Sequence, residues 1–290
     1  MIISASYRTD IPAFYADWFR ARLAAGVCWG ANPYSGKPYR VSLRPEDVTG
    51  YVFWTRNPAP FADALKAVTR QELPFIVQMT ITGYPRALDA ATIDPARAVA
   101  LMQELRETYG PRALVWRYDP IVLSDLTPPD WHRENLARLA AALRGAVDEV
   151  VVSFLQVYRK TARNLNASGL DWQDPTPMEK QALLAELLPL AAAQGLRLSL
   201  CGQRDLLIPG VQDAACVEAA RLADIAGKPL VTVGKSHRAG CGCAPSRDIG
   251  DYDTCPHGCV YCYAVRHRDL AKRRFQRHDP RAESLRAAGP

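Results

Sequence analysis

Strands and helices alternate along most of this 290-residue chain, and the alternation limits its fold more than any other feature. Short runs of apolar, β-branched or aromatic residues are separated by segments whose apolar residues recur at helical spacing. The predicted strands are 2–7, 50–54, 75–80, 113–118, 149–155, 196–200 and 230–233. The predicted helices are 12–25, 59–70, 95–109, 129–144, 178–194 and 213–226. This order predicts β-α-β units and a parallel sheet.

We expect an α/β fold in which residues 1–234 form a parallel (β/α) barrel of six to seven strands, and therefore an incomplete one. Strands that are apolar on both faces, such as Val150-Val151-Val152, fit a sheet covered on both sides. A doubly wound open sheet is the alternative, although no G-x-G-x-x-G follows any predicted strand. Residues 26–43 predict an added hairpin. Residues 235–290 predict a cysteine-rich cluster loop and a basic helix packed on the same domain.

The composition is that of a globular protein, with 48% hydrophobic and 23% charged residues. No apolar run approaches the roughly 18 residues that a membrane span requires, and the N-terminus has neither a basic stretch nor a cleavage site of a signal peptide. We therefore expect a cytoplasmic protein without a membrane partner. In that compartment the eight cysteines predict metal ligands or reactive thiols rather than disulfides.

Three cysteines near the C-terminus have the spacing C-x3-C-x2-C, and Tyr261 directly precedes the third: Cys255, Cys259 and Cys262. This spacing places three soft thiolates on one tight loop. Such a loop suits three irons of a [4Fe-4S] cluster and leaves the fourth iron without a thiol from the motif. Zinc is the alternative, with His257 or Cys243 as its fourth ligand.

Four further cysteines could hold a second iron–sulfur cluster: Cys201, Cys216, Cys241 and Cys243. Cys201 ends a predicted strand, and Cys241 and Cys243 form a C-x-C pair. This hypothesis rests on the number of cysteines left over. Cys216 can equally be a small buried hydrophobic residue, and we assign Cys28 to packing.

Polar side chains follow several predicted strands, where the active site of a parallel barrel lies. Arginine recognises carboxylate and phosphate groups through two parallel hydrogen bonds, so arginines on this rim predict a pocket for an anion. The candidate cofactor-binding residues are Arg8, Arg56, Arg117, Gln78 and Tyr261. Asp10 and Asp119 are the candidate catalytic residues, which either orient the arginines or transfer protons.

Over nearly its whole length the chain resembles a bacterial family catalogued as domain of unknown function 1848. The supporting segments are 8–12, 53–58, 116–121 and 241–264. This resemblance implies an iron–sulfur cluster on the C-terminal cysteines. Residues 255–263 are also similar to the cluster loop of radical S-adenosylmethionine (SAM) enzymes, including spore photoproduct lyase.

The radical SAM resemblance implies that SAM chelates the open iron and that a reductant such as ferredoxin or flavodoxin supplies an electron. Reductive cleavage of SAM would give a 5′-deoxyadenosyl radical, which abstracts hydrogen from a substrate. The arginines of the rim would then meet the carboxylate of SAM. We expect an anionic substrate, either a small molecule or a nucleic acid.

The position of the loop in the chain predicts a circular permutation. Radical SAM enzymes usually carry this loop after the first barrel strand, whereas here it follows the last predicted strand. If 230–233 corresponds to that first strand, then 235–262 is the cluster loop and 263–279 is the first helix. The N-terminal strand then takes second place in the barrel, with Arg8 and Asp10 beside the cluster. Barrels tolerate permutation because their termini can lie close together.

Two other functions remain open from the sequence. The first is an iron–sulfur electron carrier or redox sensor without SAM chemistry, in which Cys241 or Cys243 supplies a fourth thiolate. The second is a zinc-stabilised nucleic-acid-binding protein that uses the basic tail. Residues 263–290 hold eight Arg or Lys residues against three Asp or Glu residues, which favours an anionic partner for this segment.

Overall fold

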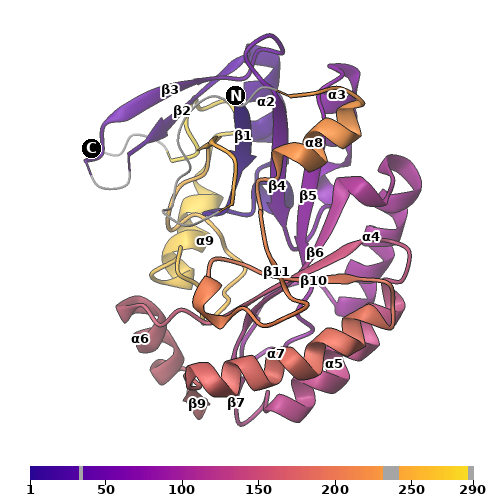
Figure 1. Ribbon diagram of the computed structural model, residues 1–290. Helices are drawn as coiled ribbons and strands as arrows, with labels where there is room; N and C mark the ends of the chain where they lie inside the picture. The colour runs from indigo at the N-terminus through magenta and orange to yellow at the C-terminus, as the bar shows by residue number, and fades with distance from the viewer. Residues whose placement is uncertain (33–34, 231–241, 287–290) are drawn as a thin grey trace.

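The structure is a computed structural model that describes residues 1–32, 35–230 and 242–286. Its main sheet has eight parallel strands in the order β11-β10-β8-β6-β5-β4-β1-β12 (Figure 1). The strands are β1 (Ile2–Ala5), β4 (Gly50–Thr55), β5 (Phe75–Thr80), β6 (Leu114–Ile121), β8 (Glu149–Phe154), β10 (Arg197–Leu200), β11 (Gln212–Asp213) and β12 (Ser246–Asp248). Parallel neighbours need crossover connections, and helices supply most of them.

The helices are α1 (Ile11–Phe14), α2 (Ala16–Ala25), α3 (Ala62–Arg70), α4 (Pro95–Tyr109), α5 (Pro129–Ala142), α6 (Arg159–Ala167), α7 (Pro177–Ala192), α8 (Ala219–Ala226) and α9 (Arg268–Gln276). Three short 3-10 turns are η1 (Ala59–Phe61), η2 (Pro111–Ala113) and η3 (Arg204–Leu206). Two antiparallel pairs lie outside the main sheet: β2 (Val27–Ala31) with β3 (Pro38–Ser42), and β7 (Leu123–Ser124) with β9 (Trp172–Gln173). In Figure 1, α5 and α7 lie side by side.

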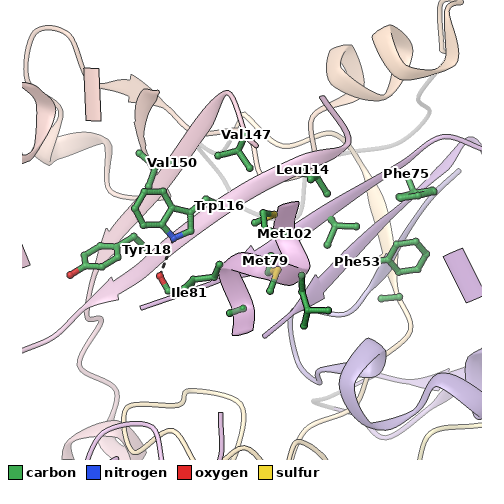
Figure 2. Close-up of a cluster of buried hydrophobic side chains, with 14 of the residues drawn as sticks. Phe53, Phe75, Met79, Ile81, Met102, Leu114, Trp116, Tyr118, Val147 and Val150 are labelled. Atoms are coloured by element: carbon green, nitrogen blue, oxygen red, sulfur yellow. Dashed lines mark hydrogen bonds between the residues drawn. The ribbon is translucent and has the colours of Figure 1, made fainter. Parts of the chain in front are cut away.

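One face of the sheet packs against the helices in a large apolar core. Figure 2 shows part of it, with Trp116 of β6 beside Met79 of β5 and Val150 of β8. The indole Nε1 of Trp116 donates to the carbonyl oxygen of Ile81 at 2.9 Å, so the buried ring leaves no polar atom unpaired. Aromatic rings extend the core toward β4, where Phe53 lies at the edge of the cluster in Figure 2.

The opposite face of the sheet has a smaller apolar core that α8 closes at the amino ends of the strands. Alternate residues of five strands line it: Ile2, Val52, Ile76, Val115 and Val151. Leu222 of α8 packs into this cluster. The neighbouring Arg221 is fully buried and bonds Glu149, the first residue of β8, at 2.9 Å. A helix therefore covers one end of this face, and the carboxyl ends of the strands form the other.

The predicted α/β fold with a parallel sheet is confirmed, and residues 26–43 form the expected hairpin. The predicted number of strands is wrong, because the short strands β11 and β12 extend the sheet to eight. The expected helix 12–25 is divided into α1 and α2, and the expected helix 213–226 begins only at Ala219. Within the described residues no hydrogen-bonded pairing joins β11 to β12, so closure into a barrel is not shown.

The last predicted strand, 230–233, falls largely outside the described residues, as does the predicted boundary at 234. β12 is the strand that precedes the cysteine loop. It pairs in parallel with β1, Ile2 opposite Ser246 and Ser4 opposite Asp248. In the described part of the chain, no helix has both the length and the apolar character that crossing a membrane requires.

Candidate metal centre

The loop with the C-x3-C-x2-C motif leaves the carboxyl end of β12 beside the carboxyl ends of β1 and β4. The hydrogen-bond ladder continues past the strand, since Ile249 N donates to Ser4 O at 3.0 Å. Parallel strands end on the same edge of a sheet, so the loop meets the residues that follow β1 and β4. Those residues include the predicted Arg8, Asp10 and Arg56.

Asp248, the last residue of β12, fixes this junction through a set of short hydrogen bonds. Its carboxylate accepts from Ser4 Oγ at 2.9 Å and from Ser6 Oγ at 2.7 Å. A side chain on Gly250 would place Cβ 2.0 Å from Ser6 Oγ, so only glycine fits there. Burial raises the pKa of Asp248, while the charge of Arg8 and the serine hydroxyls act in the opposite direction.

Asp10 connects the cysteine loop to the turns after β1 and β4. Its Oδ2 lies 2.7 Å from His257 Nε2 and accepts from Arg56 N at 2.7 Å. Its Oδ1 accepts from Ala13 N at 2.9 Å, which caps α1. The other ring nitrogen of His257, Nδ1, lies 3.4 Å from Ala91 O. Asp10 therefore positions the loop, and its predicted role in proton transfer stays a prediction.

Arg56, Asp89 and Tyr261 form a closed triangle under the same loop. Arg56 donates to Asp89 Oδ2 at 2.8 Å and to the Tyr261 hydroxyl at 2.6 Å. The Tyr261 hydroxyl donates in turn to Asp89 Oδ1 at 2.7 Å, and Thr82 Oγ1 completes the set at 2.9 Å. Charge-assisted bonds of this kind are among the strongest in proteins. Tyr261 is buried, and its hydroxyl anchors the loop to Arg56, which follows β4, and to Asp89 in the segment between β5 and α4.

The three thiols of the loop are half-buried, and they lie near enough for Cys255 and Cys262 each to influence the pKa of Cys259. Burial raises the pKa of Cys255 to about 12, while backbone N–H groups of His257 and Asp10 that bond its sulfur act in the opposite direction. Burial likewise raises the pKa of Cys262, and backbone N–H groups again oppose the shift; Ala264 N lies 3.3 Å from its sulfur. Burial and the charge of Asp89 raise the pKa of Cys259, and the charge of Arg56 opposes that shift.

A second group of cysteines surrounds Arg117, on the face of the sheet closed by α8. Arg117 bonds Asp119 through Nε at 2.9 Å and Nη2 at 2.6 Å. Its Nη1 lies 3.0 Å from Cys216 Sγ, and Cys216 Sγ lies 3.1 Å from Cys201 Sγ. Cys243 Sγ accepts from Val217 N at 3.4 Å.

Gln78 and Trp54 complete the surroundings of Arg117. Gln78 Nε2 donates to Cys216 O at 2.9 Å, and its Oε1 accepts from Arg117 Nη1 at 3.2 Å. The guanidinium of Arg117 lies 5.0 Å from the ring centroid of Trp54, a cation–π distance. Burial opposes the charge of Arg117, but Asp119 and the sulfurs of Cys216 and Cys201 raise its pKa well above the usual range.

The structure thus divides the predicted site residues into two groups on one rim. The first contains Arg8, Asp10, Arg56, Tyr261, Cys255, Cys259 and Cys262. The second contains Gln78, Arg117, Asp119, Cys201, Cys216 and Cys243. Cys241 lies outside the described residues. The groups are neighbours, because the charges of both Cys259 and Asp119 raise the pKa of the buried Arg56.

Within the described residues, neither group is arranged as a binding site for a single metal ion. Among the residues that the structure describes, no three His, Cys, Asp or Glu side chains are placed so that they could hold a single ion. A cavity of about 230 Å³ lies beside Arg56 and is lined by Thr80, Thr82 and Tyr84. A larger hollow between α2 and α3, of about 580 Å³, has no residue of either group in its lining.

Sequence reasoning missed Asp89, Asp248 and Trp54. Asp89 follows no strand directly, and nothing in the sequence links it to Arg56. Asp248 had a usable signal, because the run Ser246-Arg247-Asp248-Ile249-Gly250 ends in a glycine shortly before the cysteines.

Comparison with known proteins gives one match. The sequence profile of a family described as a domain of unknown function (DUF1848) matches residues 2–264. No curated protein and no solved structure matches the chain. The profile covers all eight strands of the main sheet and the complete C-x3-C-x2-C loop. The chain therefore belongs to the family of domain of unknown function 1848.

Proposed function

We propose that this protein is an iron–sulfur enzyme of the radical SAM type. Cys255, Cys259 and Cys262 would bind three irons of a [4Fe-4S] cluster and leave the fourth iron for SAM. The bound cluster would supply one electron for reductive cleavage of SAM. The residues of the chain would hold the cluster, orient SAM and exclude water.

The observation that carries this proposal is that the three thiols of one loop lie near one another, with Arg56 beside Cys259. His257 lies in the loop itself, but its Nε2 is engaged by Asp10 and its Nδ1 faces a carbonyl oxygen. Cys243 belongs to the other cysteine group, where its sulfur accepts from Val217 N. Three thiolates without a fourth ligand suit a cluster that binds a small molecule. A four-coordinate zinc site or a fully ligated electron carrier would need a fourth ligand, and in the described structure His257 and Cys243 have the other contacts just given.

Hydrogen bonds to the sulfurs give independent support. Backbone N–H groups bond Cys255 and Cys262, and Arg56 lies beside Cys259. Such donors stabilise thiolates and adjust the reduction potential of iron–sulfur clusters. The positive charges of Arg56 and Lys160 oppose the rise that burial causes in the pKa of Cys262.

The strand order supports a permuted barrel. The strand before the cysteine loop, β12, lies beside β1, and α9 follows the loop. Reading the sheet from β12 gives a strand, cluster loop and helix followed by β1, β4, β5, β6 and β8 in spatial order. This is the order in which a radical SAM barrel would be read if its first β-α unit had moved to the C-terminus.

Arg8 is the best candidate for the carboxylate of SAM. Arg56 is bonded to Asp89 at 2.8 Å and Arg117 to Asp119 at 2.6 Å, so both charges are already matched. Arg8 also pairs with Asp248, but at the longer distance of 3.8 Å. Its Nη1 and Nη2 donate to Gly250 O and the Tyr7 hydroxyl at 3.4 and 3.2 Å, while its buried Nε has no hydrogen-bond partner in the described structure. A carboxylate would satisfy that donor. An electron donor such as ferredoxin or flavodoxin and an anionic substrate complete the proposal.

Anaerobic reconstitution with iron and sulfide tests this function. Reconstituted protein incubated with SAM and dithionite should release 5′-deoxyadenosine, and a Cys255→Ala, Cys259→Ala, Cys262→Ala variant should not. Arg8→Lys should weaken SAM binding, measured by equilibrium dialysis, with the cluster content unchanged. If protein with a full [4Fe-4S] cluster releases no 5′-deoxyadenosine, radical SAM activity is excluded. Zinc in place of iron, together with salt-dependent DNA binding, would favour a nucleic-acid-binding protein.

A further inference from the structure

We propose that Cys201, Cys216 and Cys243 form a second thiolate metal centre, separate from the C-terminal cysteine loop. This goes beyond the proposed function, because it concerns residues that the SAM chemistry does not use. It also survives if the first site proves to have another role.

Three distant segments of the chain bring these cysteines together. Cys201 follows β10, Cys216 follows β11, and Cys243 precedes β12, so the group joins both ends of the eight-stranded order. Cys201 Sγ and Cys216 Sγ lie 3.1 Å apart. All three residues contact the apolar cluster of the sheet face that α8 closes. Cys28, by contrast, is buried without another cysteine in the large apolar core on the other face of the sheet.

Hydrogen-bond donors point at two of these sulfurs. Arg117 is held by Asp119 through Nε and Nη2, which leaves Nη1 to bond Cys216 Sγ at 3.0 Å. Val217 N bonds Cys243 Sγ at 3.4 Å. Neutral thiols are weak acceptors and usually pack as small hydrophobic side chains. N–H donors around clustered cysteine sulfurs are instead the surroundings typical of metal-bound thiolates.

The arrangement favours an iron–sulfur cluster over a single ion. Among the described residues these three sulfurs are not placed to hold a single ion. A cluster spreads its cysteine ligands over several irons, so binding it would move Cys201 Sγ away from Cys216 Sγ, which lies 3.1 Å from it here. The soft thiolate set excludes magnesium and calcium. We therefore expect iron with acid-labile sulfide at this site.

Metal analysis of two matched triple variants tests the proposal. One carries Cys255→Ser, Cys259→Ser and Cys262→Ser, and the other Cys201→Ser, Cys216→Ser and Cys243→Ser. After anaerobic reconstitution, each should keep about half of the iron and sulfide of the wild-type protein, because each cubane contains about four irons. Cys28→Ser, also buried but alone, should keep all of it. Loss of all iron from the first variant while it remains folded by circular dichroism would overturn the proposal.

A measurement on the unaltered protein covers the case in which the triple variants do not fold. Wild-type protein is alkylated under native anaerobic conditions, before and after iron chelation, and the modified cysteines are located by mass spectrometry. Bound metal should protect Cys201 and Cys243, the partly exposed members of the group, and chelation should increase their labelling several-fold. Equal labelling before and after chelation, or a disulfide between Cys201 and Cys216 in anaerobically purified protein, would contradict a metal centre.

Discussion

His257 Nε2 lies 2.7 Å from Asp10 Oδ2, and this contact joins the cysteine loop near the C-terminus to the first turn after the N-terminal strand. The two residues are 247 positions apart. Both are buried, and Asp10 also bonds backbone N–H groups of α1 and of the turn after β4. One carboxylate therefore fixes three chain segments around the thiols.

Removal of that carboxylate should destabilise the metal-free protein. Asp10→Ala leaves His257, Arg56 N and Ala13 N without their acceptor, and each unpaired buried donor costs about 1–3 kcal/mol. We expect the free energy of unfolding in urea to fall by at least about 2 kcal/mol. Asp17→Ala, at an exposed position of α2, is the control and should change it little. Equal stability of the two variants would show that the Asp10 contacts contribute nothing.

The Arg56–Asp89–Tyr261 triangle should matter more for cluster binding than for folding. Tyr261→Phe keeps the packed ring but removes the hydroxyl that bonds both charged residues. We expect the free energy of unfolding to fall by about 1–2 kcal/mol and the rate of cluster loss to an iron chelator to increase. Tyr252→Phe is the matched control, a tyrosine of the same loop outside the triangle. Unchanged cluster retention in Tyr261→Phe would contradict an anchoring role.

The buried His132 should make stability depend on pH. Burial lowers its pKa from 6.5 to about 4, although its bond to the carbonyl of Val122 opposes the shift. Between these two values the unfolded chain binds a proton that the folded chain does not, so stability falls as the pH decreases from 6.5 to 4. The expected loss is up to about 3 kcal/mol.

Urea unfolding across this pH range measures the effect. His132→Gln should flatten the profile between pH 6.5 and 4, whereas His267→Gln, at an exposed position before α9, should leave it as in the wild type. Other groups that titrate in this range, such as the buried Asp248, are the same in all three proteins, so the difference isolates His132. Parallel profiles for wild type and His132→Gln would refute the assignment.

Arg221 should be the arginine whose loss costs most stability. It bonds Asp148 and Glu149 at 2.9 Å from a fully buried position on α8. Arg221→Met removes the buried one of two arginines that pair with Glu149, and Arg197 still bonds that carboxylate at 2.9 Å. We therefore expect a cost near the lower end of the roughly 3–5 kcal/mol that breaking a buried pair entails. Arg20→Met, whose pairs are exposed, should cost less than about 1 kcal/mol. Similar unfolding free energies for both variants would contradict the role of α8 in closing this face.

The regular strands were predictable because their residues alone specify them. Runs such as Val150-Val151-Val152 are apolar on both faces, and that pattern requires a sheet with two covered sides. β12 was not predictable in this way. Its three residues, Ser246, Arg247 and Asp248, carry no apolar run, and the strand forms because Asp248 bonds Ser4 of β1 and Ser6 just after it.

The candidate site was predictable in composition but not in arrangement. Spacing alone identified Cys255, Cys259 and Cys262, and strand ends identified Arg56 and Arg117. The pairing of Arg56 with Asp89 depends on two strands lying next to each other. The contact of Arg117 with Cys216 crosses 99 positions of the chain. Contacts of this range follow from strand register, which the sequence pattern of a single segment does not contain.

Electron paramagnetic resonance of reconstituted, reduced protein tests the central claim most directly. The best sample is the Cys201→Ser, Cys216→Ser, Cys243→Ser variant, because it should contain only the cluster of the C-terminal loop. The claim is that three thiolates hold a cluster with an open iron. Addition of SAM should therefore change the spectrum of the reduced [4Fe-4S] cluster. A spectrum that is identical with and without saturating SAM, from protein with a full cluster, would contradict the claim and indicate a fourth protein ligand.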